Sequence, residues 1–233
     1  MKMENTTGIL LQGNIRGWTI PIIEEYQQNF PDSEIVLSTW NNEDVSNIPC
    51  KVIQSDLPEF GSNNSVFNHI RSNNYQIVGS RNGLKEMKSN IILKTRTDMF
   101  VHNPNIFKIF LAENVEDKIM YPHSRLHKDS KDYWIYDVIQ LSTKDTLSNY
   151  WDSMPLHDGQ KRIPPEEYFT KNYVLNIKKD YRPWKIVRDI YFIGKRYHED
   201  FQIEFEKYQL EQYQNYLLTA SRDSVLNSIN IPQ

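Results

Sequence analysis

Short apolar runs alternate with longer segments of helical periodicity over the first hundred residues. Each run is brief and ends at a polar or turn-forming residue, which favours buried β-strands. We expect these strands at residues 8–12, 34–39, 51–54 and 91–98. Residues 19–30 and 67–88 carry apolar side chains at helical spacing, with Thr19 as the expected N-cap of the first helix. This order of elements predicts an α/β fold with a mostly parallel central sheet flanked by helices.

The second half of the chain is less regular. Helices are expected at residues 104–111, 144–151, from 166 onward, and at 201–218. Strands are expected at residues 118–121 and 133–141, with an extended segment at 184–192. The tail from residue 221 onward is weakly patterned, as chain ends often are.

Polar or turn-forming residues stand where three of the predicted strands end. Gln12, Gly13 and Asn14 close the first strand, Trp40 follows the second, and Asp98 follows the fourth. Open α/β sheets bind ligands beyond the carboxyl ends of their strands, so these residues are candidates for binding one. Glycine permits close approach to the backbone, asparagine can read a base, and an indole can stack on one. A plain turn at Gly13-Asn14 and a core position for Trp40 remain open alternatives.

Two cations on the second predicted helix are candidates for binding phosphate. Arg81 and Lys85 are four residues apart and therefore share a helix face, and Arg71 lies on the same segment. A guanidinium group matches phosphate oxygens with two hydrogen bonds. The alternative is a basic face exposed to solvent.

Two carboxylates in the second half are candidates for a general base. Glu166 and its neighbour Glu167 follow Pro164-Pro165 at a helix start, where capping the helix is an alternative role. Asp137 lies in the apolar run 134–139, and a charge in such a run needs a partner or a function.

Composition narrows the classes of function. The net charge of −3 gives no basic excess for binding nucleic acid. The single Cys50 excludes an internal disulfide and fits a reducing compartment, so we expect a cytoplasmic protein. The N-terminal residues are polar, and no apolar run is long enough to cross a bilayer, although peripheral membrane association stays open.

The order of several segments resembles the WavE-type glycosyltransferases of lipopolysaccharide synthesis. The segments are Gln12-Gly13-Asn14, Ile35–Trp40, Asn74–Leu84, Lys94–Met99 and the Pro-Glu-x-Tyr element Pro165-Glu166-Glu167-Tyr168. The resemblance covers most of the chain, up to about residue 207. It implies a GT-A fold with a nucleotide-sugar-binding half at residues 1–100 and an acceptor-binding half at 101–220, followed by a tail at 221–233.

The resemblance also implies a chemistry. The donor would be a nucleoside-diphosphate sugar, the acceptor a glycan or glycolipid, and Glu166 the matching position for the base, with Asp137 as the alternative. A divalent cation, Mn²⁺ or Mg²⁺, would bind at Asp98. The sequence departs from the usual Asp-x-Asp signature at Arg96, which leaves dependence on a metal open.

These observations predict a glycosyltransferase that acts on a lipopolysaccharide or capsule-like acceptor. One alternative is a catalytically weak nucleotide-sugar-binding module of a larger glycan-assembly protein. A nucleotidyltransferase ranks last, because it would need a glycine-rich basic loop after the first strand. The segment 13–17 is too sparse in glycine and basic residues for that.

Overall fold

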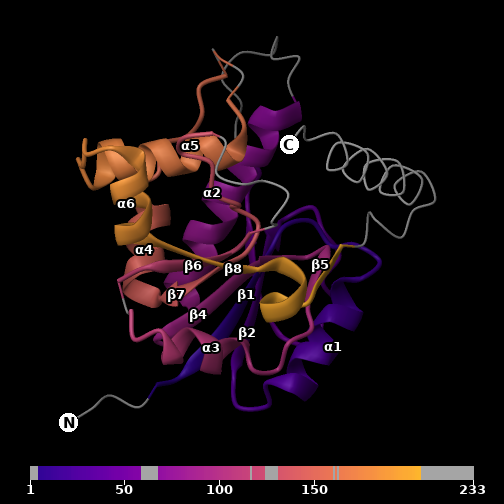
Figure 1. Ribbon diagram of the computed structural model, residues 1–233. Helices are drawn as coiled ribbons and strands as arrows, with labels where there is room; N and C mark the ends of the chain where they lie inside the picture. The colour runs from indigo at the N-terminus through magenta and orange to yellow at the C-terminus, as the bar shows by residue number, and fades with distance from the viewer. Residues whose placement is uncertain are drawn as a thin grey trace, which may run out of the picture.

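The computed structural model describes residues 5–58, 68–115, 117–123, 131–159, 161 and 163–205. Its centre is a seven-stranded sheet with the order β3-β2-β1-β4-β7-β6-β8, and β5 pairs with β9 in a second, two-stranded sheet (Figure 1). The strands are β1 (Thr7–Gln12), β2 (Glu34–Trp40), β3 (Lys51–Ser55), β4 (Ile91–Arg96), β5 (Met99–Val101), β6 (Ile119–His123), β7 (Gln140–Thr143), β8 (Phe192–Arg196) and β9 (Ile203–Phe205).

The central sheet is mostly parallel. β1 lies between β2 and β4 and runs parallel to both, β3 continues this set, and β6 runs parallel to β8. Only β7 runs antiparallel to its neighbours β4 and β6. The predicted α/β class, with a mostly parallel sheet flanked by helices, is confirmed. Strands from both predicted halves share this sheet, while the division into halves stays a prediction.

Helices cover both faces of the sheet. Apolar side chains of α1 and α3 join the core on one face, and those of α2, α4, α5 and α6 contribute to the core on the other. Two π-helical turns, η1 and η2, follow α5 and β8. The helical elements are α1 (Thr19–Asn29), α2 (Asn68–Glu86), α3 (Ile106–Ala112), α4 (Lys144–Asp152), α5 (Pro165–Lys171), η1 (Asn172–Ile177), α6 (Trp184–Tyr191) and η2 (Tyr197–Phe201).

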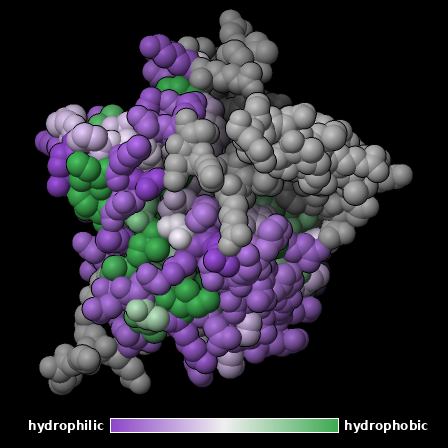
Figure 2. All heavy atoms as spheres, in the orientation of Figure 1, coloured by the Kyte–Doolittle hydropathy of each residue, from purple (hydrophilic) through white to green (hydrophobic). Residues whose placement is uncertain are grey.

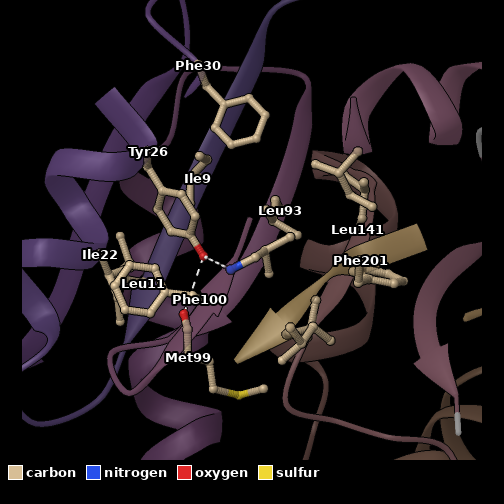
Figure 3. Close-up of a cluster of buried hydrophobic side chains, with 14 of the residues drawn as sticks. Ile9, Leu11, Ile22, Tyr26, Phe30, Leu93, Met99, Phe100, Leu141 and Phe201 are labelled. Atoms are coloured by element: carbon tan, nitrogen blue, oxygen red, sulfur yellow. Dashed lines mark hydrogen bonds between the residues drawn. The ribbon is translucent and has the colours of Figure 1, made fainter. Parts of the chain in front are cut away.

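The core beneath α1 fixes the chain just after β4. Tyr26 of α1 is fully buried, and its hydroxyl donates to the carbonyl of Met99 and accepts from the amide of Val101 (Figure 3). Alternate residues of the strands, such as Ile9 and Leu11, point into the same core. Because α1 binds the backbone of β5 in this way, the turn between β4 and β5 is held in place.

The orientation of α2 decides which of its residues lie near the strand ends. A Cβ added to Gly79 would meet the side chain of Gln12, and one added to Gly83 would meet Leu10. The helix therefore runs antiparallel to β1, and residues after Gly83 lie toward the amino ends of the strands. Its glycines allow this close packing, although glycine is unfavourable inside a helix.

Three expected elements differ in the structure. Residues 184–191, expected to be extended, form α6, in which Trp184 and Val187 are buried on one face. Residues 133–139 carry no regular structure, and only residues 140–143 form a strand, β7. Residues 203–205 form β9 and Phe201 ends η2 where a terminal helix was expected, and residues 206–218 of that helix lie outside the described residues.

Figure 2 shows the hydropathy of the described residues on one face of the protein. Most of the visible face is hydrophilic, and the hydrophobic side chains form separate small groups. None of the described helices combines the length and the apolar character needed to cross a membrane.

Candidate functional site

The loop after β1 is tied to the end of β4. Gly13 has φ of +135° and its amide donates to the carbonyl of Ser38 at 3.1 Å. A Cβ at Gly13 would stand 2.9 Å from Oγ1 of Thr97, and this hydroxyl donates to the carbonyl of Asn14 at 2.6 Å. A side chain at position 13 would therefore be strained by both its backbone and its neighbour. These contacts hold the two loops against each other at the carboxyl ends of β1 and β4.

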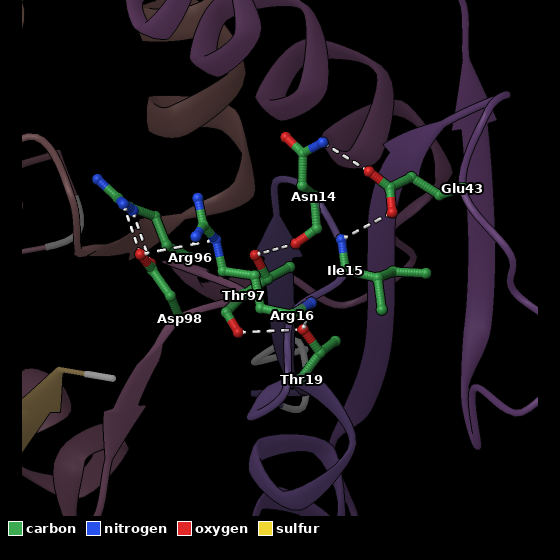
Figure 4. Close-up of polar contacts among 8 residues, drawn as sticks. All are labelled: Asn14, Ile15, Arg16, Thr19, Glu43, Arg96, Thr97 and Asp98. Atoms are coloured by element: carbon green, nitrogen blue, oxygen red, sulfur yellow. Dashed lines mark hydrogen bonds and ion pairs between the residues drawn. The ribbon is translucent and has the colours of Figure 1, made fainter. Parts of the chain in front are cut away.

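Glu43 holds the loop from the other side (Figure 4). Its carboxylate accepts from Nδ2 of Asn14 at 2.5 Å and from the amide of Ile15 at 3.3 Å. The Thr19 hydroxyl accepts from the amide of Arg16 and donates to the carbonyl of Thr97. Thr19 is thus the first residue of α1 and not its N-cap, which is Trp18. These bonds leave the loop of residues 13–16 ordered, with Asn14 half-buried at the strand edge.

Asp98 and Arg96 form a bidentate ion pair in the turn after β4. Nε of Arg96 donates to Oδ1 of Asp98 at 2.9 Å, and Nη2 donates to Oδ2 at 2.7 Å. Figure 4 shows Arg16 reaching the same carboxylate, with its Nε 4.0 Å from Oδ2. The Asp98 side chain is only 7% exposed, whereas those of Arg96 and Arg16 are 32% and 52% exposed. The edge of the sheet therefore presents two guanidinium groups organised by one buried carboxylate.

The side chains around Asp98 do not fit a divalent cation. Mg²⁺ and Mn²⁺ take hard oxygen ligands, yet both oxygens of Asp98 already accept hydrogen bonds from Arg96. The guanidinium group offers no oxygen and repels a cation. Within the described ranges, no three His, Cys, Asp or Glu side chains are grouped so as to hold a metal ion. The donor set thus gives no support to the Mn²⁺ or Mg²⁺ expected at Asp98, and we assign no step of the reaction to a cation.

Glu166 lies within electrostatic reach of this ion pair, although it is distant in sequence. It occupies the first turn of α5 and is half-buried, and α5 contacts α2. Burial alone would lower the pKa of Arg96, but the carboxylates of Asp98, Asp137 and Glu166 raise it. Arg96 therefore keeps its charge between these three carboxylates.

The neighbouring Glu167 has a structural role. Its two carboxylate oxygens accept hydrogen bonds from Lys131 and Lys171, each at 2.6 Å. These bonds hold the pKa of Glu167 below its usual range. Because both oxygens are engaged by lysines, Glu167 stabilises the fold around α5, and only Glu166 of this pair remains a candidate base.

Asp137 belongs to a buried polar network. Its carboxylate accepts from Nε2 of Gln76, and its carbonyl accepts from Nζ of Lys94 at 3.0 Å. Nζ also donates to Oε1 of Gln76 at 3.1 Å and lies 4.7 Å from the centre of the Trp151 ring. Asp137 is 2% exposed and Lys94 is fully buried. The expected strand around Asp137 is absent, and the charge is satisfied by these partners instead.

The phosphate-binding role expected of Arg81 and Lys85 is not supported by their positions. Arg81 donates to the carbonyls of Trp151 and Met154 at the end of α4, so it joins two helices. Lys85 is exposed in the last turn of α2, toward the amino ends of the strands. The side chain of Arg71 lies outside the described residues.

Two strand-end candidates are also occupied by packing. Trp40 is fully buried, with its ring centre 5.0 Å from that of Tyr75, so its indole offers no face to a base. Gln12 is 3% exposed, and its Nε2 donates to the carbonyl of Tyr75 at 3.3 Å. The base-stacking role expected of Trp40 is thus replaced by the core alternative. Tyr75, which is half-buried, is the aromatic residue nearer the surface here.

Sequence reasoning missed four residues that organise this edge. Lys94 interrupts an apolar strand and could have been found by the argument applied to Asp137, that a buried charge needs a partner. Glu43, Gln76 and Thr97 gave no signal, because their partners are distant in sequence.

Comparisons with known proteins add a family and a weak structural likeness. A family model described as WavE lipopolysaccharide synthesis matches residues 11–176. Among curated proteins, none matches the chain significantly.

Two solved structures illustrate the structural likeness. A glycosyltransferase involved in the glycosylation of the major capsid of PBCV-1 is 13% identical, with 82% of each chain covered and a TM-score of 0.47. The 4-diphosphocytidyl-2C-methyl-D-erythritol synthase of Anaerococcus prevotii is 8% identical, with 83% of this chain and 91% of that chain covered and a TM-score of 0.48. With TM-scores below 0.5, these likenesses are too weak to support a function.

Proposed function

The chain belongs to the WavE lipopolysaccharide synthesis family, and we propose that it is a glycosyltransferase. It would transfer a hexose from a nucleoside-diphosphate sugar to a lipopolysaccharide or capsule-like glycan. We place the reaction in the cytoplasm, because the chain has a single cysteine, and allow peripheral contact with the membrane that carries a glycolipid acceptor.

One observation carries this proposal. The loop of residues 13–16 and the Arg96–Asp98 pair lie together at the carboxyl ends of β1 and β4, and Glu166 is within electrostatic reach of Arg96. Ligands of open α/β sheets bind at this edge. The loop supplies a close-packed backbone, the guanidinium groups supply positive charge, and Glu166 supplies a carboxylate within electrostatic reach of them. A phosphorylated donor and a hydroxyl acceptor need these three kinds of group.

The proposed reaction is a displacement at the anomeric carbon of the donor sugar. A bond forms between the acceptor oxygen and the anomeric carbon, and the bond from that carbon to the diphosphate oxygen breaks. The nucleoside diphosphate leaves with the electron pair, and the acceptor proton passes to a carboxylate. We assign this proton to Glu166, because it is half-exposed, and keep Asp137 as the alternative. Asp137 is almost fully buried and already accepts a hydrogen bond from Gln76.

The test is release of nucleoside diphosphate from a panel of nucleotide sugars, with and without oligosaccharide acceptors. The proposal predicts slow release from at least one donor, which rises several-fold when an acceptor is added. A nucleotide-sugar-binding module would bind a donor but release nothing with any acceptor. Glu167→Gln serves as a control for the assay with Glu166→Gln, because the two residues are neighbours and Glu167 is engaged by lysines.

A further inference from the structure

The Arg96–Asp98 pair occupies the position where a metal-binding carboxylate was expected. We propose that Arg96, assisted by Arg16, binds the diphosphate of the donor, and that Asp98 is a positioning residue that orients Arg96. This inference rests on the proposed function and names the groups that neutralise the leaving diphosphate.

The geometry leaves part of the Arg96 guanidinium group available. Its Nε and Nη2 are bound to the two oxygens of Asp98, whereas no partner for Nη1 occurs among the described residues. The side chain is 32% exposed, so part of it reaches solvent. A guanidinium group held on one edge by a carboxylate can donate two hydrogen bonds from another edge to phosphate oxygens. Asp98 is buried and bound, and it therefore acts through Arg96.

Two guanidinium groups gather at Asp98. Arg96 and Arg16 lie 2.7 and 4.0 Å from its carboxylate, and the carboxylates of Asp137 and Glu166 also act on Arg96. The surrounding carboxylates raise the pKa of Arg96, so it stays charged as the donor is bound and broken down. The leaving nucleoside diphosphate gains negative charge when the sugar bond breaks. A guanidinium group already fixed in place stabilises that charge without reorganising.

Another arginine of the chain provides a matched control. Arg182 also forms a bidentate pair with an aspartate two residues away, Asp180, at 2.9 and 2.5 Å. This pair precedes α6, and its arginine side chain is 55% exposed. Removing Arg182 therefore removes the same chemical group in the same type of pair, away from the strand ends.

The experiment is a calorimetric titration of the full chain with uridine and guanosine diphosphate, in EDTA and again in manganese chloride. We expect one diphosphate to bind with the same affinity in both buffers. Arg96→Gln should weaken its binding about 10- to 100-fold, as expected for loss of hydrogen bonds between charged groups. Arg16→Gln and Asp98→Asn should weaken it less, and Arg182→Gln should leave it unchanged.

The opposite results are equally clear. Diphosphate binding that requires manganese and is lost in Asp98→Asn would overturn the inference and restore Asp98 as a metal ligand, with the proposed function intact. Wild-type affinity in Arg96→Gln, or an equal loss in Arg182→Gln, would also overturn it. If Arg96→Gln does not fold, Arg96→Lys keeps the charge but not the fork and should show a smaller loss. Absence of any diphosphate binding in both buffers would contradict the proposed function itself.

Discussion

The stability of this protein should depend on pH through Lys94. This side chain is fully buried, and the acceptors of its Nζ among the described residues are neutral oxygens, those of Gln76 and the Asp137 backbone. Burial lowers the pKa of Lys94 from its usual 10.5 to about 7, with the Asp137 carboxylate opposing this and Arg96 reinforcing it. Between these two pH values the unfolded chain binds a proton that the folded protein does not. The free energy of unfolding therefore rises with pH across this window.

The expected size follows from the same two values. A lowered lysine pKa makes the charged form costly in the folded state, and this cost is fully present below pH 7. Above pH 7 this free-energy cost falls by no more than about 1.4 kcal/mol per pH unit. Between pH 7 and pH 9 the free energy of unfolding of the wild type should rise by roughly 2 kcal/mol, whereas that of a Lys94→Met variant should lack this rise.

The assay is urea unfolding of both proteins at several values between pH 6.5 and pH 9. Ile92→Met, on the same face of β4, is the control, because it disturbs the same core without removing a titratable group. Its difference from the wild type should be constant with pH. Parallel stability curves for the wild type and Lys94→Met would refute the reasoning and mean that Lys94 stays charged in the folded protein.

The remaining predictions concern the strand-end site. Gly13→Ala should weaken nucleoside-diphosphate binding, because its Cβ would stand 2.9 Å from Thr97 Oγ1; unchanged affinity in a calorimetric titration would contradict this. Glu166→Gln should lower turnover by roughly 10²- to 10⁴-fold with donor affinity unchanged, as steady-state kinetics would show. If Asp137→Asn loses turnover and Glu166→Gln does not, the two roles should be exchanged. Glu167→Gln should instead lower the melting temperature, because two lysines lose their partner.

The strands that build the site were predictable from the sequence. β1, β2 and β4 are short apolar runs that lead into polar residues. A strand that is buried on both faces of a parallel sheet is expected to show such a continuous apolar run. Their parallel pairing then brought Gly13 and Thr97 together at one edge. The edge of the sheet that we propose as the site could therefore be predicted from the sequence, although its contacts could not.

Two segments were predicted wrongly because local sequence patterns do not determine their conformation. The segment 184–191 is rich in β-branched residues, which favour strands, yet Pro183 precedes a helix whose Trp184 and Val187 enter the core. The apolar run 134–139 predicted a strand, but most of its side chains are buried without strand pairing. In both segments, packing against elements distant in sequence determines the conformation. A short stretch of sequence carries no information about such contacts.

Several expected site residues make contacts that no local pattern shows. Asp98 was expected to be available to a metal, but the nearby Arg96 takes both of its oxygens. Trp40 stands at a strand end, as predicted, but α2 covers it through Tyr75. Arg81 and Lys85 lie on the predicted helix. The contacts of α2 with β1 show that this helix runs from the carboxyl ends of the strands toward their amino ends, which the sequence alone does not reveal.

The central claim is that a nucleoside-diphosphate sugar binds at the carboxyl edge of β1 and β4. The most direct measurement is a crystal structure of the full chain with a non-hydrolysable nucleotide sugar. The account predicts the diphosphate within hydrogen-bond distance of the Arg96 guanidinium group, and the sugar on the side of Glu166. A diphosphate bound elsewhere, or bound at Asp98 through a metal ion with Arg96 displaced, would contradict it.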